Sequence, residues 1–435
     1  MKSSGFVLDA SILLIISVIT RGLPFLLLPL LTVYLSPEDF GYVAYLGSLV
    51  ALGTIFVGCN SHSFLIVKWS EIDVDQRISF IAITLKIAGF MSFLVFICLV
   101  IWFNLFSSLK FHFSIMIFIT LMALSRSLFL TLDAVLQSNK MLRPLAAILS
   151  LQTFLHYGIA LFLLEYTLQN WQGKFFGELL ASLTVGFITI AYFKRNRLLS
   201  LRSQKYHFRE VTKYCSPLVF HLLGLWVMGS IDRIMLVEMK GLEAAGIYTV
   251  AYTLGMSLDF IHQALSKVWS PWFYRSILSP DKKIKKSIVR FTYSYIFFAV
   301  LMLIVFVLTV PHIFDFFIDK RYSQATPVMA IIALGYTLEV FRKLFIGYLF
   351  TLNKTTLIAA LTFIAAILNI VLNSWLIPNF GIQGAAWATV LTYAVISFIT
   401  VVVSTKVHDM PWHQFGISVG AICTPLLDRT DEQRK

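Results

Sequence analysis

The chain has 435 residues, of which 58% are apolar and 13% are charged. A soluble protein typically has about 45–50% apolar and about 25% charged residues, so both values indicate a chain that lies largely within a membrane. They leave no room for a large soluble catalytic domain. The net charge of +13 is typical of a membrane protein that keeps Lys and Arg in its cytoplasmic loops. These basic residues form no single stripe, which argues against nucleic-acid binding.

Twelve apolar runs follow one another, and each is long enough to cross a bilayer as a helix. Between the first two lies Ser36-Pro37-Glu38-Asp39, which is typical of a helix start because it combines a Ser cap, an early proline and an acid three residues after the cap. Between the last two, residues 378–381 (Pro-Asn-Phe-Gly) predict a tight turn. The sequence therefore predicts an all-α polytopic membrane protein with about twelve transmembrane helices. The predicted spans are 7–33, 40–67, 78–104, 113–137, 145–164, 175–193, 214–237, 244–267, 289–314, 325–350, 355–377 and 381–403.

The loops between these spans alternate in their content of Lys and Arg. The loops on the side of the N-terminus, together with the two termini, carry 24 basic residues, against 5 on the opposite side. Because basic residues are retained in the cytoplasm, this ratio predicts that both termini are cytoplasmic. The strict alternation also favours an even number of spans.

The basic loop 194–213 lies midway along the spans. It predicts an N-terminal six-helix bundle over 1–193, a cytoplasmic linker over 194–213, a C-terminal six-helix bundle over 214–403 and a cytoplasmic tail over 404–435. Within the tail, the apolar run 416–427 is too short to cross a membrane.

A short pattern recurs in the two predicted bundles. The turn after the first span contains Glu38-Asp39-Phe40-Gly41, and the turn after the seventh contains Glu243-Ala244-Ala245-Gly246, so E-x-x-G returns 205 residues later. Both turns lie at the equivalent place in their halves and on the same predicted side of the membrane. A repeat of two parallel six-helix halves predicts this arrangement, with the substrate bound between them.

One arginine interrupts the first span. Arg21 lies at mid-span, beside Gly22 and Pro24 and before Pro29. A charge at the bilayer centre costs at least about 2.5–3.5 kcal/mol on insertion scales, so such a residue is expected to face a cavity or a partner. A proline kink would free backbone groups toward water or substrate. We therefore expect Arg21 to line a cavity.

Further charges lie within the fourth, eighth and tenth spans. Arg126 and Asp133 are seven residues apart on one helix face, which predicts that they pair in one conformation and part in another. Glu339 shares a face with Arg342 and Lys343, three and four residues later, so an ion pair is expected there. Two further acids are expected to be structural: Asp232 pairs with the neighbouring Arg233, and Glu178 lies near a span end.

The mid-span cations outnumber the mid-span acids. A cationic cavity suits an anionic substrate, and guanidinium groups bind phosphate through paired hydrogen bonds. The sequence thus predicts a cationic cavity that suits an anionic substrate such as one carrying phosphate. The acids are candidates for ion coupling or gating, and Asp259 could act with His262 in the eighth span. For Glu339, Arg342 and Lys343 in the tenth span, a purely structural polar seam is the alternative. The predicted cavity residues are Arg21, Arg126, Arg342 and Lys343, and the coupling candidates are Asp133, Asp259 and Glu339.

Sequence motifs of catalysis are absent. There is no G-x-x-x-x-G-K-[ST], so the chain has no ATPase motif of its own, and there is no G-x-S-x-G or H-E-x-x-H. The four cysteines are far apart and include no C-x-x-C pair. These observations predict a non-enzyme without a metal or cofactor.

Three segments resemble one known family. Residues 232–236 and 243–248 resemble its pattern D-R-x-x-L…E-x-x-G-x-Y, and residues 368–392 resemble its signature L-N-x-x-L-N-x-x-L-I-P-x-x-G-x-x-G-A-A-x-A-T. Residues 35–41 resemble the turn after its first span. The family is that of the bacterial O-antigen and capsule repeat-unit flippases. It belongs to the multidrug/oligosaccharidyl-lipid/polysaccharide exporter superfamily.

The resemblance implies two six-helix bundles that work by alternating access. The implied substrate is an undecaprenyl-pyrophosphate-linked oligosaccharide, carried from the cytoplasmic to the periplasmic leaflet of the bacterial inner membrane. An ion gradient would drive it. Membrane lipids, a polysaccharide polymerase and chain-length proteins are the implied partners. By analogy with the lipid-linked peptidoglycan-precursor flippase of the same superfamily, an arginine in the first span is expected, and Arg21 is the matching candidate.

Two other functions are compatible with parts of the sequence. A cation-coupled multidrug extruder of the same fold would need an acidic cavity, and the excess of mid-span Arg and Lys counts against it. An integral-membrane sugar polymerase or acyltransferase would need a larger loop outside the membrane, and the short outer loops count against that.

Overall fold

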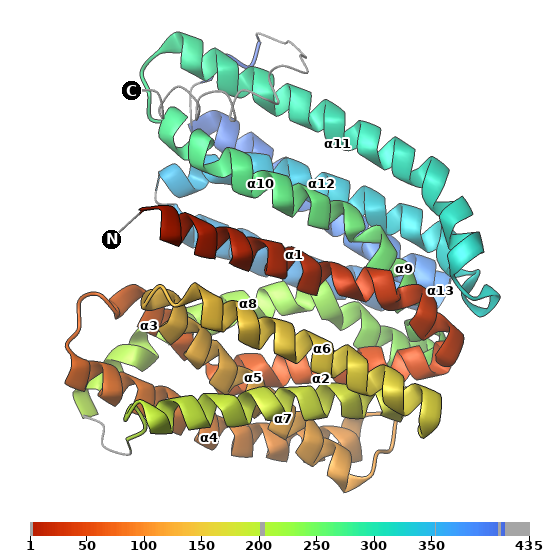
Figure 1. Ribbon diagram of the computed structural model, residues 1–435. Helices are drawn as coiled ribbons and strands as arrows, with labels where there is room; N and C mark the ends of the chain where they lie inside the picture. The colour runs from red at the N-terminus through yellow and green to blue at the C-terminus, as the bar shows by residue number, and fades with distance from the viewer. Residues whose placement is uncertain (1–2, 201–204, 353, 408–409, 414–435) are drawn as a thin grey trace. The chain divides into compact units, whose positions relative to one another are not determined.

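The computed structural model describes residues 3–200, 205–352, 354–407 and 410–413 (Figure 1). The side chains of residues 3–15, 17–18, 21, 205–207 and 355 lie outside this description. The described ranges are helical and contain no β-strand. In chain order, the elements are α1 (Ser3–Tyr34), α2 (Pro37–Gly58), α3 (Ser61–Lys68), α4 (Val74–Ile101), the π-helical η1 (Trp102–Phe106), α5 (Phe113–Ser138), α6 (Leu142–Tyr166), α7 (Trp171–Arg195), α8 (Lys205–Lys240), α9 (Leu242–Gly255), α10 (Ser257–Ser276), α11 (Lys282–Phe317), the 3₁₀-helical η2 (Lys320–Tyr322), α12 (Ala325–Thr351) and α13 (Thr355–Val407).

The twelve predicted apolar runs coincide with helices, and the all-α membrane fold is confirmed. Among the described residues, nine helical stretches are long and apolar enough to cross a membrane. Two runs are divided. Run 40–67 comprises α2 and α3, because Cys59 (φ 44°) and Asn60 (φ 54°) adopt the left-handed conformation between them. Run 244–267 comprises α9 and the first part of α10, which are separated at Met256.

The predicted turn at 378–381 is confirmed: α13 comprises two helices joined at Gly381, which has φ 56° and ψ −131°. Glycine adopts this conformation readily because it has no Cβ. The two helices fold back on each other, since the Asn369 amide of the first lies 3.5 Å from the Thr392 hydroxyl of the second.

The predicted start of α2 is confirmed. The Ser36 hydroxyl accepts a hydrogen bond from the backbone N–H of Asp39 at 3.1 Å, and the Asp39 carboxylate accepts one from the N–H of Ser36 at 3.1 Å. Pro37 occupies the first helical turn, where a proline costs no hydrogen bond. The other Asp39 carboxylate oxygen accepts a hydrogen bond from the backbone N–H of Trp171, so the same residue also fixes the start of α7.

The helices cluster into two compact units, Met1–Gly246 and Ile247–Lys435. In the first unit, α6 packs along α7, α5 packs against α2 and α7, and α8 packs against α2. In the second unit, α12 packs along α13 and against α10 and α11. The predicted bundle boundaries around the loop 194–213 stay a prediction.

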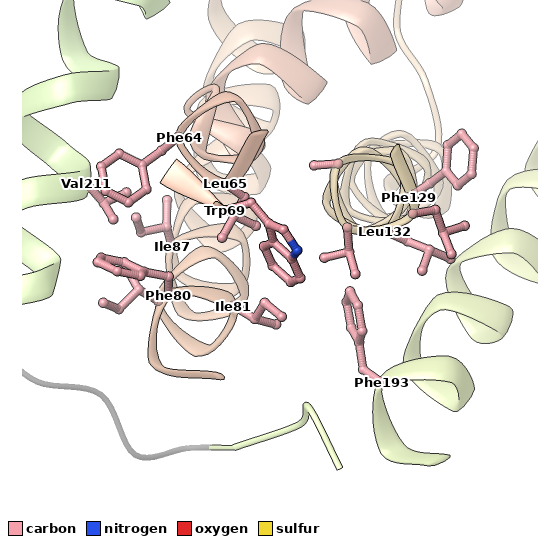
Figure 2. Close-up of a cluster of buried hydrophobic side chains, with 14 of the residues drawn as sticks. Phe64, Leu65, Trp69, Phe80, Ile81, Ile87, Phe129, Leu132, Phe193 and Val211 are labelled. Atoms are coloured by element: carbon pink, nitrogen blue, oxygen red, sulfur yellow. The ribbon is translucent and has the colours of Figure 1, made fainter. Parts of the chain in front are cut away.

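A hydrophobic core at one end of the first unit ties its helices together. Figure 2 shows it: Phe64 from α3, Phe80 from α4, Leu132 from α5 and Phe193 from α7 converge with Trp69, the residue that follows α3. The Trp69 indole N–H donates to the Asn139 side-chain oxygen at 3.1 Å, at the end of α5. This core fixes α5 and α7, the helices that carry the Arg126–Glu178 ion pair.

The two E-x-x-G turns start equivalent helices. Helix α2 begins at Pro37 and α9 begins at Leu242, 205 residues later, which is the offset of the sequence repeat. The helix starts meet through their glycines. A Cβ on Gly41 would lie 2.0 Å from the Leu242 carbonyl oxygen, and one on Gly246 would lie 1.7 Å from the Pro37 carbonyl oxygen. The two contacts are related by the same offset of 205 residues.

The core of the second unit is aromatic. Trp269 and Phe273 from α10 pack with Phe291 and Tyr295 from α11 and with Tyr348 from α12. Ring centroids of these neighbours lie 5.1–6.5 Å apart. Aromatic rings bury large areas and have few rotamers, so they hold α10 against α12 in a defined register. That register places the ionic side chains of these two helices.

Candidate functional site

Helices α10 and α12 bring Asp259 and Lys343 together. Asp259 lies in the first turn of α10, and its carboxylate accepts hydrogen bonds from the Lys343 ammonium and, at 2.7 Å, from the Gln263 amide one turn later. Asp259 is only 6% exposed, whereas the Lys343 side chain is 32% exposed. The pair is therefore half-buried, with its cation on the more accessible side.

The predicted ion pair on α12 is confirmed. The Arg342 guanidinium donates through Nε and Nη2 to both carboxylate oxygens of Glu339, at 2.6 and 2.5 Å. The two residues are one helical turn apart and Glu339 is buried. Such a two-point contact holds the guanidinium in one orientation. Lys343, on the next position, turns to Asp259 on α10.

These four side chains form two neutral pairs, which we call the α10–α12 ionic cluster. It contains Asp259, Glu339, Arg342 and Lys343, with two acids and two bases. Charges inside a membrane protein are expected to be paired in this way, since an unpaired charge has no compensation in a low-dielectric surrounding. An anion that binds here must displace a carboxylate from a cation.

Buried tyrosines and a histidine pack in the same unit. The hydroxyls of Tyr252 (α9) and Tyr336 (α12) lie 2.5 Å apart, and the Tyr336 ring contacts that of Tyr393. His262 shares a hydrogen bond of 3.1 Å with the Tyr295 hydroxyl. Tyr252, Tyr295, Tyr336 and Tyr393 were not predicted from the sequence. For Tyr252 alone, the spacing of one helical turn from Tyr248 in an apolar run is a signal that could have identified it.

In the first unit, Arg126 forms an ion pair with Glu178 of α7 rather than with Asp133. The His156 ring nitrogen Nε2 lies 3.9 Å from the same carboxylate. Asp133 lies on the same face of α5, two turns after Arg126, and its carboxylate accepts a hydrogen bond from the Gln137 amide at 2.8 Å. Glu178, expected to be structural from its position, thus compensates the Arg126 charge.

The remaining predictions concern α1, α8 and the tail. Helix α1 continues through Pro24 and Pro29, but the side chain of Arg21 lies outside the described residues. Asp232 and Arg233 are paired as expected, at 3.7 Å. The apolar run 416–427 lies outside the described residues.

The sequence matches one protein-family model, described as polysaccharide biosynthesis protein, over residues 6–277. A protein of the Lsg locus of Haemophilus influenzae is 21% identical over 218 residues, which are 47% of this chain and 52% of the relative. This chain therefore spans about half the length of that curated relative.

Two solved structures resemble the fold along most of the chain. The lipid II flippase MurJ in an inward closed conformation has a TM-score of 0.67 at 15% identity, covering 99% of this chain and 91% of that one. A multidrug resistance MATE family transporter of the MOP superfamily, in an inward-facing conformation, has a TM-score of 0.66 at 11% identity, covering 89% and 97%. At these identities the similarity shows a shared fold.

Proposed function

The chain belongs to the polysaccharide biosynthesis protein family, and from this membership we propose that it is a flippase for a lipid-linked oligosaccharide. Its substrate is an undecaprenyl-pyrophosphate-linked repeat unit of an O-antigen or capsule. The protein carries it from the cytoplasmic to the periplasmic leaflet of the bacterial inner membrane. The family match carries this proposal, and the fold shared with a lipid II flippase supports transport rather than enzymatic chemistry.

The physical problem is the pyrophosphate. About 30 Å of hydrocarbon separates the two leaflets, and an uncompensated anion is strongly disfavoured there. Arg342 and Lys343 are the cations that we propose to compensate it, with Arg126 and Arg21 as further contacts. Arg342 and Lys343 are already paired with Glu339 and Asp259, so the phosphate oxygens replace carboxylates instead of binding free cations.

This exchange couples the substrate to a cation. When pyrophosphate takes the place of the Asp259 or Glu339 carboxylate, the released acid must bind a proton or a metal cation, because it is buried. Substrate binding and cation binding therefore promote each other. Asp259 and Glu339 are the proposed coupling residues in this scheme, and Asp133 is a third candidate in the first unit. The direct partners are membrane lipids, and a polysaccharide polymerase and chain-length proteins act downstream.

The test is transbilayer movement in proteoliposomes. Lipid-linked oligosaccharide is placed in the inner leaflet, and its arrival outside is read with an impermeant lectin. We expect protein-dependent movement that falls at least about tenfold in Lys343→Ala and Arg342→Ala, the loss of about one charge-assisted contact each. Lys406→Ala is the matched control, since Lys406 is exposed in the last turn of α13. No movement by the wild-type protein would refute the proposal.

A cation-coupled multidrug extruder is the second candidate, supported by a fold similarity to the MATE transporter that nearly equals that to the flippase. The same liposomes distinguish the two. Efflux of cationic dyes without movement of the lipid-linked sugar would favour the extruder. A new glycosidic or ester bond formed by the pure protein would instead indicate a polymerase or acyltransferase.

A further inference from the structure

A cavity of about 350 Å³ lies in the first unit, at the end where α5 and α7 begin. Its volume is within the range of ligand-binding pockets, about 300–1,000 Å³. Five aromatic rings and four polar side chains line it. The aromatic residues are Tyr42, Phe111, Phe118, Trp171 and Phe176, and the polar residues are Lys110, His112, Ser114 and Gln172.

The aromatic walls are held in place by each other. Tyr42 and Trp171 are stacked, with ring centroids 5.1 Å apart and an interplanar angle of 27°. Phe111 meets both rings edge-on, at 5.7 and 6.0 Å. The backbone of Trp171 is fixed by its hydrogen bond to Asp39. A ligand would therefore meet a preformed surface, which reduces the ordering cost of binding.

The polar groups leave donors and acceptors for a ligand. The Gln172 side-chain amide makes no hydrogen bond with any described residue, and it can both donate and accept. The Lys110 ammonium donates to the carbonyl oxygens of Phe103 and Asn104 at 3.2 and 3.3 Å, which uses two of its three protons. None of the lining residues is acidic.

This combination differs from that of a larger cavity in the same unit. The larger one, of about 530 Å³, lies among α2, α4 and α8 and is lined almost entirely by apolar side chains. A hydrocarbon chain would suit that cavity. The smaller cavity instead offers flat aromatic surfaces beside hydrogen-bonding groups and one cation.

We propose that the 350 Å³ cavity binds a sugar ring that carries a carboxylate. A sugar ring has an apolar C–H face that fits against aromatic rings and a rim of hydroxyls that matches Gln172 and Ser114. A carboxylate on the ring would face Lys110, the one Lys or Arg in a lining that includes no acidic residue, while the nearby Asp39 carboxylate is occupied by the backbone N–H groups of Ser36 and Trp171. The choice of a saccharide as ligand rests on the proposed function. The count of basic residues in the loops predicts that this end of the unit faces outward, so the cavity would receive the sugar portion as it leaves.

The test measures binding apart from transport. The full-length protein is prepared in nanodiscs free of sugar-based detergents and titrated with methyl glucuronide and methyl glucoside, which differ in the carboxylate. Binding is followed by saturation-transfer NMR and calorimetry. We expect saturable binding of both, with the glucuronide favoured by up to about fivefold, the contribution of one exposed charge pair.

Three variants assign the contacts. Gln172→Ala should weaken both ligands several-fold, Trp171→Leu should abolish binding of both, and Lys110→Ala should reduce the glucuronide to the affinity of the glucoside. Trp375→Leu is the control for the tryptophan, because Trp375 is 65% exposed and lies in the other unit. A thermal unfolding curve of each variant reports whether the variant is folded. If Trp171→Leu fails to fold, Gln172→Ala still tests the site, because it leaves the stacked Tyr42 and Trp171 rings in place.

Several results would overturn the inference. The absence of saturable sugar binding to the wild-type protein would overturn it. If Trp171→Leu nevertheless lowered the unfolding temperature, the aromatic rings would serve only to anchor the protein at the membrane interface. Binding that Gln172→Ala and Trp171→Leu leave unchanged would place the sugar elsewhere. A glucuronide preference that survives Lys110→Ala would refute the role of the cation. Sugar binding without lipid movement would refute the flippase function and leave this site standing, and the converse result would refute the site alone.

Discussion

Replacement of Asp259 by Asn should increase the affinity of the α10–α12 ionic cluster for pyrophosphate. The substitution keeps the shape of the side chain and its position beside Gln263, but it removes the carboxylate that holds the Lys343 ammonium. In the wild-type protein the anion must displace this carboxylate. In Asp259→Asn the ammonium has no acidic competitor on α10, and its 32% exposed side chain remains accessible.

The magnitude follows from the burial of the pair. An exposed pair contributes about 0.2–1 kcal/mol, whereas removal of one member of a buried pair costs about 3–5 kcal/mol. Asp259 is buried and Lys343 is partly exposed, so an intermediate value of about 2 kcal/mol applies. This value corresponds to a change of about 30-fold in the dissociation constant.

Calorimetry with inorganic pyrophosphate, on the full-length protein in nanodiscs, measures the effect at constant ionic strength. The double variant Asp259→Asn, Lys343→Met should lose the gain in pyrophosphate affinity that Asp259→Asn alone produces. Gln263→Ala is the matched control, because it removes a hydrogen bond from the same carboxylate but leaves both charges. An Asp259→Asn protein that binds pyrophosphate no more tightly than the wild type would show that the carboxylate is not the competitor, and the exchange scheme would fail.

Three further predictions concern stability and use thermal unfolding of the protein in nanodiscs. Gly41→Ala should destabilise by about 1–3 kcal/mol because its Cβ would overlap the Leu242 carbonyl, whereas Gly47→Ala, with no described atom within 4 Å of its Cβ, should be tolerated; equal effects would contradict the glycine contact. Glu178→Gln should cost about 1–3 kcal/mol by leaving Arg126 uncompensated, and adding Arg126→Gln should recover part of that loss; strict additivity would show that the pair is not coupled. Gly381→Ala should cost about 1–3 kcal/mol, because φ 56° with ψ −131° is a conformation that a residue with a Cβ rarely adopts, and an unchanged unfolding temperature would refute the glycine requirement of this turn.

Local patterns predicted most of the fold. The apolar runs identified the helices because a span must satisfy its backbone hydrogen bonds internally and be apolar over its whole length. The Ser36 cap and the turn at 378–381 depend on residues close in sequence, so they too were predicted. The break at Cys59 and Asn60 was missed because a cysteine in the left-handed conformation has no sequence signal, and Asn60, a residue type that adopts this conformation more often than most, lies inside the long apolar run 40–67.

The ionic groups of the candidate site were predicted less well, because most of their partners lie far away in the sequence. Glu339 and Arg342 are one turn apart on a helix, and helical periodicity alone predicts their pair. The partners of Lys343 and Arg126 lie 84 and 52 residues away in the chain, where no local pattern connects them. A count of charges along the spans therefore found an excess of cations, whereas the folded α10–α12 ionic cluster is neutral.

The structure gives a physical reason for the two glycines of the E-x-x-G repeat, Gly41 and Gly246. A glycine at the fourth position of each motif is needed because the carbonyl of the other helix start occupies the place of its Cβ. The contacts Gly41–Leu242 and Gly246–Pro37 are the same contact made twice, since each residue number differs from its counterpart by 205. Two helix starts with equal requirements are what a duplicated sequence motif produces when its two copies pack against each other. The repeat thus accounts for both glycines at once, and a larger side chain at either position disrupts the same interface from opposite sides.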